Sequence, residues 1–279
     1  MNAVLPPRPV LVTGCSSGIG RTTAIGLKAR GYRVFASART EADLKGLREL
    51  GLEAVHLELA NPDTIAACVD RVLTATGGTL YGLFNNAAYG QPGAVEDLPM
   101  AALREQFEVN LFGTHEMTRR MLPVMRAQGY GRIVMTSSVL GFVCMPFRGA
   151  YNASKYALEG YCDTLRLELS GSGVHVVLVQ PGPIRSRFRD NAYAAFLRHI
   201  DPEHSVHRSR YQAITRRFQQ EGPVMPFTLG PEAVLAKVIK ALEAKHPRPR
   251  YRVTFPTYLF AALKRLLPTR LLDRILIRG

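Results

Sequence analysis

The chain has 279 residues, of which 47% are hydrophobic and 21% charged, as in an ordinary globular protein with a full core. Its formal net charge of +14 admits nucleic acid, an anionic membrane or an anionic small molecule as partner, but no nucleic-acid-binding motif is present, which argues against the first. The sequence also lacks internal repeats, a secretory signal pattern and an apolar run of about 20 residues, which argues against a solenoid, a secreted protein and a membrane-spanning helix.

Strands and helices alternate over the first two-thirds of the chain. Short apolar runs predict strands at 10–13, 33–37, 54–59, 80–84, 132–136 and 174–179. Amphipathic stretches predict helices at 20–30, 41–50, 62–76, 103–125 and 150–170. This alternation predicts an α/β fold of the Rossmann type, a doubly wound parallel sheet with helices on both faces. Ligands of such sheets bind beyond the carboxyl ends of the strands.

The last third is less regular. Residues 183–228 are rich in Arg, His, Phe and Tyr, and their length predicts a substrate lid. A helix at 231–244 and a strand at 250–255 follow. The tail, 256–279, mixes apolar and basic residues; this suits an interfacial helix on anionic lipid, and equally a helix docked on the body or on a partner subunit. We expect residues 1–279 to form a single domain of the Rossmann type.

Four cysteines are scattered without a C-x-x-C pair or metal-ligand spacing: Cys15, Cys68, Cys144 and Cys162. We interpret them as free thiols in a reducing compartment. The expectation is therefore a cytoplasmic protein with no disulfide framework and no metal site.

A glycine-rich segment, 13–20, joins the first strand to the first helix. Its glycines permit a tight turn and let backbone N–H groups approach a pyrophosphate, while the helix presents its positive end to the phosphates. The alternative is an ordinary strand-to-helix turn. The residues predicted to bind a dinucleotide here are Gly14, Ser16, Ser17, Gly18, Ile19 and Gly20.

The spacing T-G-x-x-x-G-x-G resembles that of the short-chain dehydrogenase/reductase family, and further motifs of that family follow in order. Tyr151 and Lys155 form a Y-x-x-x-K pair on one helix face. A nearby ammonium would lower the pKa of a tyrosine, which then serves as general acid or base. Ser138 lies thirteen residues before Tyr151, at the family's separation between catalytic serine and tyrosine, and Ser137 is the neighbouring candidate. The spacing favours Ser138, and the hydroxyl of Ser138 would bind the substrate oxygen.

Asn110 is a polar residue in an otherwise mostly apolar helical stripe that includes Leu103 and Phe107. It is either a satisfied core asparagine or, as the family resemblance implies, an organiser of a water chain to the lysine. The resemblance thus implies four catalytic residues, Asn110, Ser138, Tyr151 and Lys155, the last of which also holds the nicotinamide ribose. It further implies a homo-oligomer.

The choice of cofactor depends on the end of the second strand. No acid stands there to take the ribose hydroxyls, and Arg39 follows, where it would attract a 2′-phosphate; a surface arginine by chance is the alternative. The resemblance therefore implies NADP(H). Further cofactor contacts implied by the resemblance are Glu58 and Leu59 after the third strand, Asn86 and Ala87 after the fourth, and Pro181, Gly182 and Ile184 after the sixth.

Residues 136–156 and the length of the region after Pro183 resemble the branch of the family that contains retinol and hydroxysteroid dehydrogenases and bacterial aldehyde reductases. Residues 226–233 and the basic, leucine-rich tail resemble bacterial NADP-dependent aldehyde reductases. The apolar residues expected at the substrate site, some of which must be core, are Val139, Leu140, Phe142, Val143, Cys144, Met145 and Phe147, which Tyr89 and Phe188 could join. We therefore expect an NADP(H)-dependent enzyme that reduces lipophilic aldehydes or ketones, or oxidises the alcohols. A retinol- or hydroxysteroid-type dehydrogenase is the alternative enzyme, and an NADP-binding sensor protein is the alternative without catalysis.

Overall fold

The computed structural model describes residues 7–220, 222 and 225–277. Its strands are all parallel and form one seven-stranded sheet in the order β3-β2-β1-β4-β5-β6-β7. The Rossmann-type architecture is confirmed. The strands are β1 (Pro9–Val12), β2 (Arg33–Ala38), β3 (Glu53–His56), β4 (Gly82–Asn85), β5 (Gly131–Thr136), β6 (Val174–Gln180) and β7 (Arg250–Arg252).

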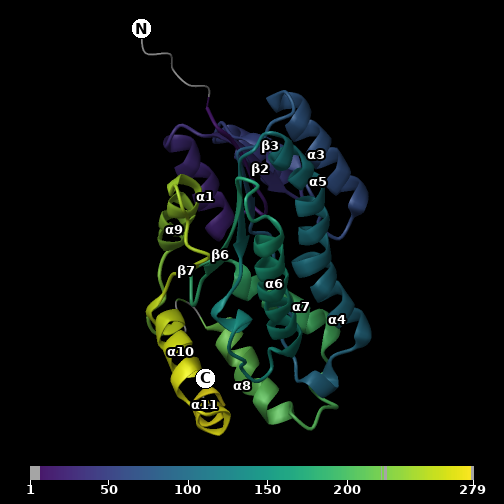
Figure 1. The fold of residues 1–279 in the computed structure, drawn as a ribbon. Coiled ribbons are helices and arrows are strands. Elements are labelled where there is room, and N and C mark those ends of the chain that lie inside the picture. Colours follow the sequence, from purple (N-terminus) through teal and green to yellow (C-terminus); the bar gives the residue numbers. More distant parts are fainter. Residues whose placement is uncertain (1–6, 221, 223–224, 278–279) are drawn as a thin grey trace.

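Helices cover both faces of the sheet because successive strand residues point to opposite sides (Figure 1). Leu11 belongs to a core shared with α3 (Pro62–Thr76), α5 (Gly113–Ala127) and α6 (Gly149–Glu168). Its neighbours Val10 and Val12 belong to a second core, shared with α1 (Gly18–Ala29), α2 (Glu41–Glu49) and α9 (Glu232–Glu243). The two cores hold the sheet rigid, and the loops at the strand ends are fixed in turn.

The helix predicted at 103–125 is longer and contains one wide turn. It consists of α4 (Met100–Phe107), a π-helical turn η2 (Glu108–Phe112) and α5. The wide turn keeps every fourth residue inside, so Ala102, Gln106, Asn110 and Thr114 are buried. The prediction that Leu103 and Phe107 line the buried stripe was wrong, because an ordinary 3.6-residue period does not include the extra residue of a π turn; both are only half-buried.

The predicted lid region holds two helices, α7 (Phe188–His199) and α8 (Arg208–Gln219). Tyr211 fixes α8 to the body. It is fully buried, its hydroxyl donates to the Asp97 carboxylate, and it accepts from the backbone N–H of Ala94 at 2.9 Å. Asp97 ends the 3-10 turn η1 (Val95–Asp97). This part of the lid is therefore a docked helix and not a loose loop.

The tail forms α10 (Phe255–Leu266) and α11 (Thr269–Leu276), which lie at one edge of the molecule, at the end opposite the N-terminus (Figure 1). Leu272 and Leu276 are buried against Val139 and Val143 of the segment after β5. The structure thus shows the tail docked on the body of its own chain, one of the three alternatives that the pattern allowed. Over the described residues, no helix has the length and apolar character to cross a membrane.

Candidate functional site

The glycine loop has the backbone geometry of a phosphate cradle. Gly14 and Gly18 adopt φ angles of +71° and +53°, which favour glycine. A Cβ added to Gly14 would come within 2.8 Å of the Ala87 Cα atom, so this glycine also permits a close approach of two loops. Ser17 is the N-cap of α1, its side chain makes no capping hydrogen bond, and no acidic residue stands in the first turn. The positive end of α1 is therefore available to an anion.

Thr13 holds the glycine loop to the end of β4. Its hydroxyl oxygen accepts from the backbone N–H groups of Asn86 and Ala87 at 2.9 and 3.0 Å. The Asn86 side chain in turn donates to the Thr13 carbonyl at 3.0 Å. Ala88, where the family has glycine, does not have a positive φ, so the backbone there needs no glycine. Sequence reasoning missed the positioning role of Thr13, which stands inside the motif.

At the other end of the predicted dinucleotide site, Arg39 and Glu58 lie beyond the ends of the adjacent strands β2 and β3. The guanidinium Nη1 of Arg39 lies 3.4 Å from the Glu58 carboxylate, and the Arg39 side chain is 69% exposed. The predicted third strand ends early, at His56. Leu59 lies beyond it with its side chain buried in the core, so only its backbone can face a ligand.

Tyr151, Lys155 and Ser138 come together at the carboxyl end of β5. All three side chains are buried. The Lys155 ammonium donates to the Thr136 carbonyl at 2.8 Å and lies 5.8 Å from the centre of the Tyr151 ring. Ser138 follows β5 directly, and its hydroxyl is near enough to Tyr151 to lower the pKa of the phenol.

Ser137 faces away from this group. Its hydroxyl donates to the buried carboxylate of Glu159, which also accepts from Gln180 at 2.8 Å and pairs with Arg250 at 2.9 Å. The hydroxyl of Ser137 is therefore occupied, whereas that of Ser138 accepts only from the backbone N–H of Leu140, at 3.1 Å, among the described residues. The spacing favoured Ser138 over Ser137, and the geometry favours the same residue.

Burial controls the protonation of the central pair. It raises the pKa of Tyr151 to about 12, against a smaller lowering by Ser138. It lowers the pKa of Lys155 to about 8, because a buried ammonium loses hydration. The lowered tyrosine pKa expected from the ammonium is not found in the protein alone, where desolvation is the main influence on the pKa of Tyr151 and Ser138 is the group that opposes it. Tyr151 is thus a neutral phenol, the form that can donate a proton.

Asn110 connects three parts of the chain. Its amide nitrogen donates to the Tyr89 carbonyl at 3.0 Å and to the Ser154 hydroxyl at 3.2 Å, and its oxygen accepts from the Tyr89 N–H at 3.2 Å. Gln106, one turn earlier, donates to the same carbonyl at 2.9 Å. The π turn therefore fixes the loop after β4 beside Lys155. Sequence reasoning missed Gln106, since its polarity suggested the exposed face of the helix.

The segment after β6 closes the site from the other side. The Pro181 carbonyl accepts from the backbone of Val139 at 2.8 Å. A Cβ added to Gly182 would come 2.2 Å from the Thr254 hydroxyl oxygen. Ile184 pairs with Leu229 across the lid as an isolated bridge. The strand ends, the lid and the start of α10 are therefore joined at this point.

Among the apolar residues predicted to line a substrate site, Val139 and Val143 are core, because α11 covers them. Phe188, which was also expected at the substrate site, does contact Tyr151. Phe188, the first residue of α7, sets its ring 5.4 Å from the Tyr151 ring, and a Cβ added to Gly90 would touch both. A Cβ added to Gly18 of the glycine loop would likewise come 2.7 Å from the Cβ of Ser186. The start of the lid thus lies over both the catalytic group and the cradle.

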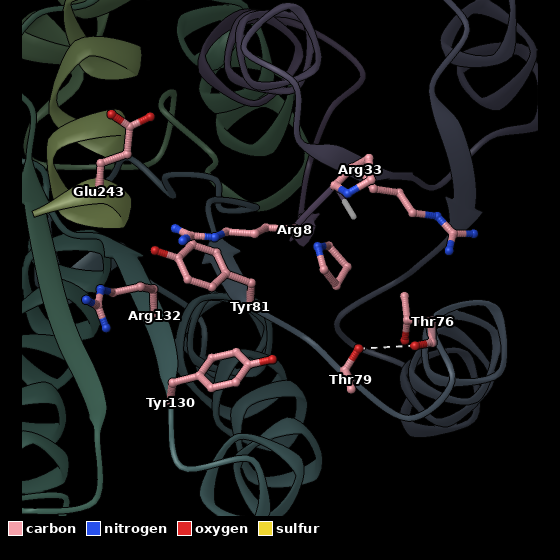
Figure 2. A pocket seen from close by; sticks show the side chains of 10 residues that line it. Arg8, Arg33, Thr76, Thr79, Tyr81, Tyr130, Arg132 and Glu243 are labelled. Atoms are coloured by element: carbon pink, nitrogen blue, oxygen red, sulfur yellow. Dashed lines mark hydrogen bonds between the residues drawn. The ribbon is translucent and has the colours of Figure 1, made fainter. Parts of the chain in front are cut away.

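A cavity of about 590 Å³ lies at the opposite, amino-terminal edge of the sheet. Figure 2 shows Arg8, Tyr81, Tyr130 and Arg132 around it. The Arg8 guanidinium is 4.7 Å from the centre of the Tyr81 ring, and the Arg33 guanidinium is paired with Glu53. None of the predicted site residues lines this cavity, so the motifs and the cavity are at different ends of the strands.

Comparisons with known proteins identify the family to which the fold and the motifs belong. Residues 8–195 match the family model for short chain dehydrogenase. The chain is 43% identical to the Escherichia coli protein YbbO, an uncharacterized oxidoreductase, over 96% of this chain and 94% of that protein. It is 33% identical to bovine 17-beta-hydroxysteroid dehydrogenase type 6, over 97% and 88% of the two chains.

Among solved structures, a short chain dehydrogenase/reductase from Burkholderia phymatum in complex with NAD is similar, with a TM-score of 0.78 and 27% identity over 93% of this chain and 92% of that one. The fold, the order of the motifs and these likenesses lead to one family and to an NAD(P)-dependent oxidoreductase. This chain belongs to the short chain dehydrogenase family.

Proposed function

We propose that the protein is an NADP(H)-dependent oxidoreductase that reduces lipophilic aldehydes or ketones, or oxidises the corresponding alcohols. The observation that carries the proposal is the buried group formed by Ser138, Tyr151 and Lys155, which lies at the same sheet edge as the glycine cradle. A phenol that is neutral in the protein alone is the proton donor that carbonyl reduction needs.

The residues present fit a nicotinamide dinucleotide. The cradle of Gly14 and Gly18, with an uncapped and acid-free start of α1, suits its pyrophosphate. The Lys155 ammonium has three donors and, among the described residues, hydrogen-bonds only to the Thr136 carbonyl, so it can hold ribose hydroxyls. When bound, the nicotinamide dinucleotide would supply or accept the hydride of the reaction. The remaining contacts are proposed for Ser16, Ser17, Ile19, Gly20, Glu58, Leu59, Asn86, Ala87, Pro181, Gly182 and Ile184.

The chain's own residues then handle the carbonyl oxygen. Ser138 and Tyr151 bind this oxygen through their hydroxyls, which stabilises negative charge as it develops. Tyr151 donates its proton to the oxygen in reduction and takes it back in oxidation. The Lys155 ammonium stabilises the phenolate that Tyr151 becomes. Asn110 positions Tyr89 and Ser154 beside this pair, and refilling of the Tyr151 proton through water near Asn110 stays a prediction.

Arg39 supports the choice of NADP(H). Its exposed guanidinium extends beyond β2, and the end of that strand carries Ser37 and Ala38 in place of an acid. A 2′-phosphate would be attracted by the guanidinium. The carboxylate of Glu58, 3.4 Å from Arg39, moderates that attraction and is the residue with which a phosphate must compete.

The aromatic group over Tyr151 supports a lipophilic substrate. Phe188 offers an aromatic ring and Gly90 has no side chain, so neither side chain can hydrogen-bond a polyol. The likeness to a hydroxysteroid dehydrogenase points the same way and keeps a steroid or retinoid alcohol as the second candidate substrate class. The family resemblance adds a homo-oligomer to this proposal, assembled through the helices that bear Asn110 and Tyr151.

The deciding experiment follows oxidation of NADPH and NADH with a chain-length series of aldehydes, for wild type and Tyr151→Phe. NADPH should support turnover of medium and long aldehydes, and the variant should lose it while still binding NADPH. Turnover of polyols with inert aldehydes would overturn the substrate class. Binding of NADPH without turnover of any aldehyde, steroid or retinoid would favour a sensor protein.

A further inference from the structure

Helix α10 has a second apolar stripe that points away from the protein. Its inner residues Phe260, Leu263 and Leu267 (the last just past the helix) pack on the body. Phe255, Leu259, Ala262 and Leu266 recur at steps of four, three and four, which puts them on one face of a helix. Phe255 and Leu266 on this stripe are 56% and 77% exposed. Packing against the body therefore leaves this outer face uncovered.

Helix α11 repeats the arrangement. Leu272 and Leu276 are buried, whereas Leu271 and Ile275, one turn apart, are 45% and 42% exposed. Phe227 of the lid extends the apolar surface, because its ring lies 4.9 Å from that of Phe255 and is 59% exposed. We call six of the large exposed residues of this region the outer apolar face: Phe227, Phe255, Leu259, Leu266, Leu271 and Ile275.

Basic residues accompany this face. Helical spacing puts Arg265 beside the stripe of α10, and puts Arg270 and Arg274 beside Leu271 and Ile275. Residues 255–277 contain four basic side chains, those at 264, 265, 270 and 274, and one acidic side chain, at 273, a net charge of +3. Apolar residues flanked by arginines are the composition of a helix that lies in a lipid interface.

We propose that the outer apolar face docks on an anionic lipid surface. Charge favours lipid over a second copy of this chain, because a two-fold contact would set a +3 surface against an identical one. Anionic headgroups instead complement the arginines while the apolar residues enter the boundary of the acyl chains. No helix among the described residues is both long and apolar enough to cross a membrane.

Docking there would bring the lid to the lipid. Phe227 belongs to the lid, and the buried side of α11 packs on Val139 and Val143 next to Ser138. A lipophilic carbonyl compound dissolved in the bilayer would then reach the site without crossing water. This second step rests on the proposed function, whereas the docking itself does not.

The first test is co-sedimentation of the full chain with vesicles of phosphatidylcholine alone and with about one-third phosphatidylglycerol. Wild type should bind the anionic vesicles and should not bind the neutral ones. Leu259→Ser with Leu266→Ser should lower the partition coefficient at least tenfold. The matched control, Ile25→Ser with Leu50→Ser, removes two exposed apolar residues on α1 and at the end of α2, outside the tail and outside the helices of the proposed oligomer contact, and should bind as wild type does. Circular dichroism checks that each variant is folded.

The charge is tested separately. Arg265→Gln and Arg274→Gln should each weaken binding to anionic vesicles about fivefold, the effect expected for one basic residue near such a surface. Lys45→Gln on α2 is the control and should leave binding unchanged. Equal binding to both vesicle types, or binding that the stripe and arginine variants do not alter, overturns the proposal. A stripe variant that instead reduces the oligomer size of the protein in solution assigns the face to a second copy and also overturns it.

Activity separates the two proposals. With a water-soluble short aldehyde, Leu259→Ser with Leu266→Ser should turn over as wild type does. With a long-chain aldehyde carried in anionic vesicles, the same variant should be slower. If wild type binds vesicles and reduces neither aldehyde, the proposed function fails while the lipid-docking face stands. If wild type reduces both aldehydes and does not bind vesicles, the lipid-docking proposal fails while the proposed function stands.

Discussion

The ring of Phe188 meets the ring of Tyr151 edge to face, with the centroids 5.4 Å apart and the ring planes inclined by 64°. Phe188 begins α7, so the first residue of the first lid helix covers the proposed proton donor. An aromatic pair of this kind contributes about 0.5–1.5 kcal/mol beyond the burial of its area. It excludes water from the phenol, which is one source of the raised pKa of Tyr151.

Replacement of Phe188 should therefore change both turnover and selectivity. Phe188→Ala is expected to lower kcat/KM for medium-chain aldehydes about tenfold, the equivalent of the aromatic contact. The kcat/KM for bulky ketones should fall less, because removal of the Phe188 ring makes room for them. Steady-state kinetics with both substrate classes checks this. Val206→Ala, an exposed substitution in the same lid region, serves as control, and an identical loss for both substrate classes would contradict a selective role.

Lys155 is expected to lower the free energy of unfolding, although the proposed reaction needs it. Its pKa falls from 10.5 to about 8 in the folded protein, so below pH 8 the fold carries a buried charge that the unfolded chain hydrates freely. Lys155→Met should abolish activity yet raise the free energy of unfolding at pH 6, by up to about 3 kcal/mol.

The sign of this effect sets its pH dependence. Between pH 8 and 10.5 the unfolded chain binds more protons than the folded one, so the stability of wild type rises relative to the variant. The gap between the two proteins should close across this window. Urea titrations at a series of pH values measure it. A variant less stable than wild type at pH 6 would show that the bond from Lys155 to the Thr136 carbonyl outweighs the desolvation cost.

Arg39 and Glu58 should set the cofactor preference in opposite directions. Arg39→Asp is expected to raise the KM for NADPH about tenfold or more, the loss of a charge-assisted hydrogen bond, with little effect on NADH. Glu58→Gln should lower the KM for NADPH, because Arg39 no longer has a competing carboxylate. Lys45→Asp on α2 controls for the change in net charge. If Arg39→Asp affects both nucleotides equally, the phosphate assignment is wrong.

Two glycines with different surroundings form a matched pair. Gly18 has a positive φ, and a Cβ there would come 2.7 Å from the Cβ of Ser186. Gly46 lies in α2 with nothing within 4 Å of an added Cβ. Gly18→Ala should weaken NADPH binding and destabilise the fold by about 1–2 kcal/mol. Gly46→Ala should stabilise it by about 0.5–1 kcal/mol, and fluorescence titration with thermal unfolding records both.

The parts of the site that could be predicted from sequence are those in which chemistry follows from local spacing. Tyr151 and Lys155 are four residues apart on a helix and necessarily share a face. The glycines of the first loop have the φ angles that their residue type suggests. The parallel sheet followed from alternation alone, since a helix between two strands is the crossover connection that parallel neighbours need. Each of these inferences needs only a few consecutive residues.

Other features were decided by tertiary packing. Gln106 is buried because a π turn shifts the register, which an ordinary helical period cannot indicate. Burial, and not the nearby ammonium, governs the pKa of Tyr151. Glu159 occupies the hydroxyl of Ser137, which supports Ser138 as the serine proposed to bind the substrate. The inner face of α11 docks on the segment after Ser138 across more than a hundred residues of chain.

The sequence by itself thus determined the fold class, the family and the order of the site residues, because backbone geometry and helical periodicity act over short distances. Only the tertiary structure decided which side chains meet, which hydroxyls are free and which face of the tail is covered. Those outcomes depend on contacts between residues far apart in the chain, whose energies no local pattern contains.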